Sequence, residues 1–218
     1  ANLTMDPQGS VTGTIKLTYL GAPALNWRQR SLTGDQTSLE RELRVSLERL
    51  LPQGMDVKLV SIDKLEDYEQ PLSANFMVKG PVGSSTGKRL LITGDIFESN
   101  SKPSFPHEKR EIAVYFHYPY IGQDAVRINF PSTFKVESLP TGDKQQFQNF
   151  AGYNMTTEST PTSVTFRRNY TLGEIWFLPK EYPELRAFYN KIETKDQESV
   201  VFTEAAPAAS ASSSPSGK

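Results

Sequence analysis

Hydrophobic and polar residues alternate along much of the chain with the two-residue period of a β-strand. The clearest example is residues 13–20, in which Ile15, Leu17 and Tyr19 share one face. In residues 57–62 the alternation shifts phase, which predicts a β-bulge. The other segments expected to form strands are residues 71–79, 89–93, 111–118, 125–130, 134–139, 147–156, 163–177 and 199–203.

Two further segments carry apolar residues at helical spacing, which predicts one helix over residues 35–51 and another over residues 182–193. The first has Asp35 or Thr37 as an N-cap and Pro52 at its end. Its apolar stripe is Leu39, Leu43, Leu47, Leu50 and Leu51. The stripe of the second is Tyr182, Leu185, Phe188, Tyr189 and Ile192, with Pro183 in the first turn.

Many short strands, separated by turns that use 15 Pro and 14 Gly, indicate a mainly β protein of the α+β class. We expect an antiparallel β-sandwich or a strongly bent sheet with one or two covering helices. Residues 1–203 are expected to form a single β-rich domain. Residues 204–218 contain Ala, Ser, Pro and Gly with nothing large enough to bury, so we expect a disordered tail.

The composition excludes several classes of function. The 24 Lys and Arg residues are balanced by 25 Asp and Glu residues, so the chain lacks the excess positive charge typical of nucleic-acid binding. No run approaches the roughly 18 apolar residues of a membrane span. The chain has no cysteine, which excludes a cysteine nucleophile, a disulfide and a thiolate metal site within it. It begins with Ala1 and has no apolar leader, so we expect a fragment of a longer protein.

The candidate motifs favour structural interpretations. Residues 80–88 (GPVGSSTGK) fail the spacing of a phosphate-binding loop and are interpreted as a hairpin loop. His107 and His117 have no metal-ligand spacing, and a stand-alone hydrolase would need one of them beside an acid and a hydroxyl. Pairs of acids are interpreted as solvated faces, and the pair Arg167 and Arg168 is too isolated for nucleic-acid binding. We expect no cofactor and no metal.

Aromatic residues raise a different possibility, because residues 115–120 (YFHYPY), with Trp27 and Trp176, have the composition of a sugar-stacking platform. Alternation on a strand divides such a run between two faces, so we expect part of it in the core and part at the rim. Exposed rings of Trp27 or Trp176 along a groove would favour an independent carbohydrate- or peptide-binding module, and buried rings would exclude it.

Three stretches together carry a family resemblance. They are residues 17–28 (LTYLGAPALNWR), residues 103–110 (PSFPHEKR) continuing to residues 115–120, and residues 181–189 (EYPELRAFY) with residues 195–201 (KDQESVV). With these stretches the chain resembles the C-terminal β-rich region of bacterial, acidobacterial-type transglutaminase-like proteins, in which a domain of unknown function precedes a papain-like core. The resemblance extends to about Phe202, and none of it is a catalytic motif.

The resemblance implies a periplasmic or cell-surface protein whose Cys-His-Asp triad lies in another domain of the same polypeptide. This chain would then be a non-catalytic accessory domain that packs on, positions or restricts access to that core, or that binds a protein or glycan partner. We expect the contact surface at His107, Arg110, Tyr118 and Tyr120. Arg110 ends a charged loop just before an apolar strand, where it can pair with a carboxylate or cap the sheet edge.

Overall fold

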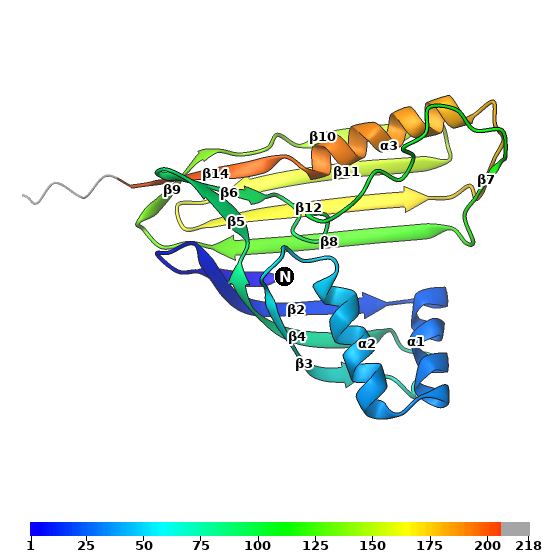
Figure 1. Ribbon diagram of the computed structural model, residues 1–218, viewed down its shortest axis with the longest axis horizontal. Helices are drawn as coiled ribbons and strands as arrows, with labels where there is room; N and C mark the ends of the chain where they lie inside the picture. Colours follow the sequence, from blue (N-terminus) through cyan, green and yellow to red (C-terminus); the bar gives the residue numbers. More distant parts are fainter. Residues whose placement is uncertain (206–218) are drawn as a thin grey trace, which may run out of the picture.

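A large curved sheet is the frame of the computed structural model, which describes residues 1–205 (Figure 1). Its eight strands follow the order β10-β11-β12-β8-β1-β2-β4-β3. Their bounds are β1 Asn2–Met5, β2 Ser10–Tyr19, β3 Asp56–Asp63, β4 Leu72–Pro81, β8 Tyr120–Asn129, β10 Asp143–Phe147, β11 Ala151–Ser159 and β12 Ser163–Leu172.

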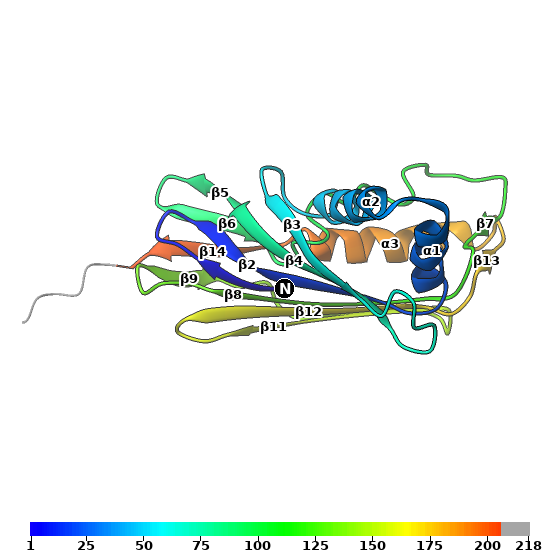
Figure 2. The same ribbon diagram turned by 90° about the horizontal axis from the view of Figure 1, so that it is seen from below.

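A second, four-stranded sheet has the order β5-β6-β14-β9, and a two-stranded ribbon pairs β13 with β7. Their bounds are β5 Gly83–Thr86, β6 Arg89–Thr93, β7 Val114–Tyr115, β9 Phe134–Ser138, β13 Trp176–Phe177 and β14 Ser199–Glu204. The helices are α1 Gly21–Thr33, α2 Gln36–Glu48 and α3 Tyr182–Asp196. The small sheet and these helices lie on the same side of the large sheet (Figure 2).

This architecture confirms the predicted class, a β-rich α+β fold built on a bent sheet with covering helices. It departs from a purely antiparallel arrangement at one pair, because β1 runs parallel to β8 with Leu3 opposite Ile128. Strand β1 alternates over only four residues, and the sequence did not predict it. Its insertion between β2 and β8 joins two antiparallel groups of strands into one sheet.

Helix α2 forms largely as predicted. Asp35 is the N-cap, and its carboxylate accepts a hydrogen bond from the Ser38 N–H at 2.7 Å, so Thr37 lies inside the helix. Leu39, Leu43 and Leu47 are buried, whereas Leu50 is 42% exposed. The placement of Leu50 in the stripe was wrong because the helix ends at Glu48 and the chain then turns.

Helix α1 was not predicted. Its sequence has weak amphipathic character, since Ala24 and Arg28 are its buried residues. The Arg28 guanidinium donates hydrogen bonds to the carbonyl oxygens of Leu65 at 3.2 Å, Lys64 at 3.0 Å and Gln70 at 2.7 Å. These bonds, made to a loop distant in sequence, fix α1 and replace the usual apolar stripe.

Helix α3 buries the whole predicted stripe, from Tyr182 to Ile192, and extends beyond the predicted end to Asp196. Its aromatic residues pack with Phe105, whose ring centroid lies 4.8 Å from that of Tyr189 and 5.7 Å from that of Tyr182. This packing joins α3 to the long connection between β6 and β7.

Several predicted strands are present with altered bounds. The bulge is confirmed as a register shift in β3 between Leu59 and Ser61. The expected strand 111–118 is reduced to β7, because Ile112 is exposed and the chain turns on both sides of the strand. Residues 147–156 and 163–177 are each interrupted by a turn, so each contributes to two strands.

The C-terminal strand extends one residue past the predicted boundary of the domain. Strand β14 includes Glu204, and the N–H of Ala205 donates to the Thr133 carbonyl at 2.7 Å. The rest of the predicted tail, residues 206–218, lies outside the described residues.

Candidate functional site

The predicted contact residues are all at the surface. His107 and Arg110 lie on the connection between β6 and β7, Tyr118 precedes β8, and Tyr120 is its first residue. His107 contributes its main chain, since its carbonyl accepts a hydrogen bond from the Tyr182 hydroxyl at 2.5 Å. Within residues 1–205 the Arg110 guanidinium makes no ion pair, and both of its predicted roles stay predictions.

An exposed aromatic surface lies beside these residues, and we define it as Ile112, Tyr115, His117, Tyr118, Trp176 and Leu178. The β7–β13 pairing creates it by placing Trp176 opposite Tyr115. The Tyr115 ring centroid lies 5.7 Å from that of Trp176 and 5.5 Å from that of His117. Trp176 is 54% exposed and Tyr115 52% exposed.

The reverse side of the same ribbon belongs to the core. Val114 and Phe177 are buried, so each strand alternates between an inward and an outward residue. The prediction that the aromatic run divides between core and rim is confirmed for this ribbon. Sequence analysis missed the pairing of Trp176 with Tyr115, because no local pattern joins positions so far apart.

Trp27 does not belong to the aromatic surface. Its ring is half-buried, 6.1 Å from the ring of Tyr19, and the Arg30 guanidinium lies 5.1 Å from its centroid. Of the two tryptophans proposed for a sugar platform, Trp176 is therefore the more exposed.

A separate, buried network of charged residues surrounds Arg168 of β12, which is 9% exposed. The Arg168 Nε donates to the Asp196 carboxylate of α3 at 2.9 Å. Its NH1 group lies 3.3 Å from the carboxylates of Asp124 and Glu98. The Tyr153 hydroxyl also donates to Asp196, at 2.7 Å. The network therefore links β8, β11, β12, α3 and the segment after β6.

Asp196 belongs to a pair of acids, with Glu198, that sequence analysis interpreted as a solvated face, and this was wrong because Asp196 is buried. The burial of Arg168 was not predicted. A signal was available for Arg168, because it shares the inward phase of β12 with Val164, Phe166, Tyr170 and Leu172. An arginine in that phase needs buried acidic partners. The identity of those partners depends on how the chain folds, since Asp124 and Asp196 are distant from Arg168 in sequence.

Burial and charge act against each other in this network. Burial raises the pKa values of the Asp196 and Asp124 carboxyls above the ordinary value, while Arg168 opposes the rise. Burial acts to lower the pKa of Arg168, but the charges of Asp196 and Glu98 raise it overall, so the guanidinium stays charged. Such a balance is typical of a buried ion-pair network that joins a sheet to a helix.

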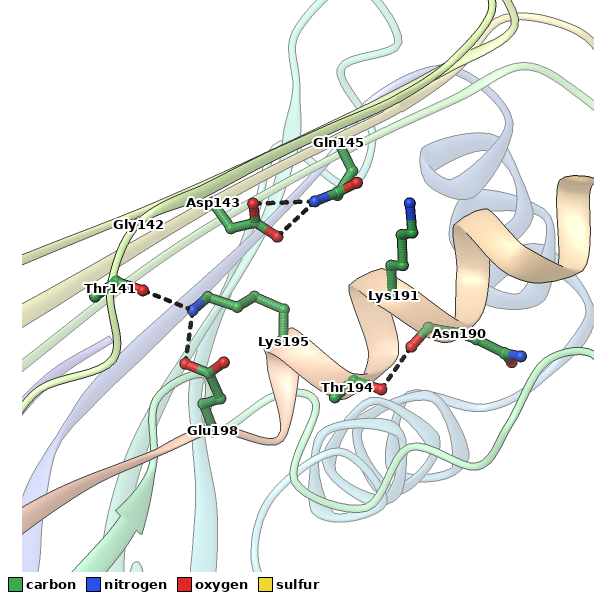
Figure 3. Close-up of a pocket in the computed structure, with 9 residues that line it drawn as sticks. All are labelled: Thr141, Gly142, Asp143, Gln145, Asn190, Lys191, Thr194, Lys195 and Glu198. Carbon is green, nitrogen blue, oxygen red and sulfur yellow. Dashed lines mark hydrogen bonds and ion pairs between the residues drawn. The ribbon is translucent and has the colours of Figure 1, made fainter.

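A polar pocket of about 600 Å³ lies between α3 and the β9–β10 connection (Figure 3). The buried Lys195 amino group donates to Glu198 at 2.6 Å and to the Thr141 hydroxyl at 3.3 Å. The Asp143 carboxylate accepts from the Gln145 amide at 3.0 Å. These lining groups bond to one another and give the pocket a polar wall.

The structure also bears on the rejected motifs. In the segment 80–88, which was interpreted as a hairpin loop, Gly80 and Pro81 end β4. The rest contributes β5 and the turn of the β5–β6 hairpin, which contains Gly87 at a φ of +62°. In the part of the chain that the structure describes, neither histidine side chain makes a hydrogen bond with an acid or a hydroxyl. Over the same residues there is no group of three or more His, Asp and Glu that could hold a metal ion.

No helix within residues 1–205 has both the length and the apolar character needed to span a membrane. No curated protein matches the sequence. Among solved structures, the chain is similar to a "putative protease" from Parabacteroides distasonis ATCC 8503, with a TM-score of 0.41 and 11% identity. The match covers 71% of this chain and 24% of the other protein, so this chain spans about a quarter of that protein's length.

Residues 88–202 match a family described as a domain of unknown function with solved structure, DUF3858. That range contains the Arg168 network and the whole aromatic surface. Because the match covers more than half of the sequence, the chain belongs to the DUF3858 family.

Proposed function

We propose that this chain is a non-catalytic accessory domain of a longer, exported polypeptide with a transglutaminase-like core. The aromatic surface would pack on that core and position it or restrict access to it. The observation that carries the proposal is the exposed Trp176–Tyr115 pair on a short ribbon whose other face is buried.

The composition of this surface supports a contact with protein. Tyr and Trp are enriched at protein interfaces because they bury a large area and retain a polar group for hydrogen bonding. Arg110 lies on the adjoining connection and is exposed, so it is available to a carboxylate on a partner. Clustered exposed apolar residues are uncommon unless they bind something.

The non-catalytic assignment rests on chemistry. The chain has no cysteine, so a Cys-His-Asp triad would have to reside elsewhere in the polypeptide. The buried charged groups around Arg168 bond to one another, which is typical of structural networks. A periplasmic or cell-surface location is part of the same proposal and derives from the family resemblance.

An independent carbohydrate- or peptide-binding module is the alternative. The exposed ring of Trp176 favours it, because an exposed aromatic face can stack on a sugar. The two functions differ in whether the domain is joined to a catalytic core.

The mass of the endogenous polypeptide tests the proposal first. An antibody raised against residues 1–205 would capture the natural product, and peptides upstream of Ala1 would be sequenced. We expect a product far heavier than 24.4 kDa that contains Cys, His and Asp in a papain-like core. A product whose N-terminus lies at or near Ala1 would contradict the proposal and favour the independent module.

Cross-linking of the intact polypeptide tests the contact itself. Lys109 and Lys180 are exposed and flank the aromatic surface, whereas Lys79 is exposed on β4 and serves as the matched control. We expect a lysine-reactive cross-linker to join Lys109 or Lys180 to the core and Lys79 much less. Trp176→Ala should reduce those cross-links severalfold, and Leu32→Ala, an exposed apolar change on α1, should not. Equal cross-linking of all three lysines would rule out this docking surface.

A further inference from the structure

Asp95, on the segment after β6, has a carboxyl oxygen that the hydrogen bonding of the described residues does not explain. The residue is 1% exposed, and its Oδ2 atom has no hydrogen-bond partner within residues 1–205. The other oxygen, Oδ1, accepts the Phe97 N–H at 3.0 Å. A buried, unpartnered carboxylate oxygen is costly, so its presence in a well-packed core requires a physical reason.

Most of the charged groups around Asp95 are negative. Asp124 of β8 lies within hydrogen-bonding reach, and Glu98 lies on the same segment as Asp95. Asp196 of α3 forms an ion pair with Arg168 of β12. The positive groups that face the cluster are the Arg168 guanidinium and the amino group of Ala1, and the Tyr120 hydroxyl of β8 adjoins it.

Arg168 directs its hydrogen bonds and ion pairs to the other acids. Its Nε bonds to Asp196, and its NH1 lies 3.3 Å from both Asp124 and Glu98. Two adjacent carboxyl groups in a buried site do not both ionise when their shared cation is already engaged. One of the pair Asp95 and Asp124 therefore has to retain a proton.

We propose that Asp95 is a neutral carboxylic acid at neutral pH, that its Oδ2–H donates a hydrogen bond to the Asp124 carboxylate, and that this shared proton fixes residues 94–101 to the large sheet. Protonation turns the unpartnered oxygen into a donor, for which the Asp124 carboxylate is an acceptor within reach. It also leaves Asp124 ionised, as its contact with Arg168 requires.

The electrostatics agree with this geometry. Burial, followed by the charge of Asp124, raises the pKa of Asp95 from 3.8 to about 8. Between these values the folded protein binds a proton that the unfolded chain does not. The stability contributed by that proton is therefore lost as the pH rises toward and through 8. Ionisation would also place a second negative charge against Asp124.

Residues 94–101 are the part of the chain that would respond. They are a turn-rich segment held by Asp95 and by bonds from the Asn100 amide to the Leu51 carbonyl and from the Gln197 amide to the Glu98 carbonyl. The following residues are held by separate bonds: the Arg186 guanidinium donates to the Phe105 carbonyl, and the Ser104 N–H donates to the Glu193 carboxylate. Residues 102–108 therefore provide an internal reference within the same molecule.

Hydrogen exchange measured by mass spectrometry tests the inference on the full chain. Exchange rates between pH 6 and pH 9 would be corrected for intrinsic chemical exchange. We expect protection of residues 94–101 in the wild type to fall by up to about tenfold per pH unit below pH 8 and to level off above it, because the closed form binds a proton in that range that the open form does not. Protection of residues 102–108 should change much less.

Asp95→Asn is the matched variant, because its amide N–H donates to Asp124 and cannot ionise. We expect this variant to retain protection of residues 94–101 at pH 9. Asp56→Asn, at an exposed acid on β3, should behave as the wild type. Acetylation of the Ala1 amino group removes the other group that titrates nearby, and the loss of protection should persist in the acetylated protein.

Infrared spectroscopy provides an independent measurement of the proton. The wild type at pH 7 should show the C=O stretching band of a protonated carboxyl group, and Asp95→Asn should lack that band. If Asp95→Asn fails to fold, Asp124→Asn takes its place, and the pH above which protection levels off should then be lower because a neighbouring negative charge is gone. Absence of the band, or an unchanged levelling-off pH in Asp124→Asn, would overturn the inference.

Discussion

Two buried arginines show how side-chain position and partner chemistry determine the role of the same residue type. Arg168 lies among carboxylates and links β12 to α3. Arg28 instead donates to main-chain carbonyls of the loop between β3 and β4, and it stacks 5.0 Å from the Tyr68 ring centroid. Main-chain carbonyls fit the planar, many-donor guanidinium, so Arg28 acts as a loop anchor.

Replacement of Arg28 tests this role. Arg28→Ala should lower the free energy of unfolding by about 3 kcal/mol, because several partly buried hydrogen bonds to main-chain carbonyls lose their charged donor. Arg28→Lys should lose part of that stability, since a single ammonium cannot reproduce the planar fork. Urea denaturation followed by circular dichroism measures both. Arg30→Ala, at an exposed ion pair with Glu42, is the control and should cost less than about 1 kcal/mol. Equal losses for the two alanine variants would exclude the anchor.

At the scale of elements, α2 and α1 are stabilised differently although they adjoin in the chain. Helix α2 buries a leucine stripe against β3 and has an aspartate N-cap. Helix α1 has little apolar surface to bury and depends on Arg28. A helix with a stripe is detectable from sequence because the stripe is local, whereas a helix anchored by long-range hydrogen bonds is not.

The corrected stripe of α2 makes a quantitative prediction. Leu43 is fully buried, so Leu43→Ala should cost about 3 kcal/mol through lost burial and the cavity that remains. Leu50 lies beyond the helix and is largely solvated, so Leu50→Ala should cost less than about 1 kcal/mol. Denaturant unfolding of the two variants against the wild type decides this. A larger loss for Leu50→Ala would restore the position that the sequence first suggested.

At the scale of the whole molecule, β14 shows how distant parts of the chain combine. It is the last strand in the sequence, yet it is an interior strand of the small sheet. It pairs with β6 on one side and β9 on the other. Its residues Val200 and Phe202 are fully buried, and Phe202 packs 5.1 Å from the Phe130 ring centroid. The last strand of the described chain is therefore part of the core.

Truncation at two points tests the importance of β14. A chain that ends at Glu198 lacks both pairings and the two buried side chains, so we expect no cooperative thermal unfolding transition. A chain that ends at Ala205 retains β14 and should melt within a few degrees of the full chain. Scanning calorimetry of both proteins provides the measurement. Cooperative unfolding of the shorter chain would show that β14 is dispensable.

The candidate site was predictable only in part. His107, Arg110, Tyr118 and Tyr120 are exposed as expected, yet the most prominent surface pair, Tyr115 with Trp176, depends on a ribbon formed by residues far apart in sequence. The Arg168 network was missed for the same reason, although the phase of β12 placed its arginine inward. Side-chain phase is a local property, but the partner of a side chain is not.

What the sequence by itself determined is the set of features with a local cause. Alternation specified most of the strands, the leucine and aromatic stripes specified α2 and α3, and the lack of cysteine excluded thiol chemistry. Only the tertiary structure decided the strand order, the insertion of β1 beside β8 and the burial of Asp95 among other acids. Strand pairing and the burial of a charge depend on contacts between residues distant in sequence, which no short-range periodicity encodes.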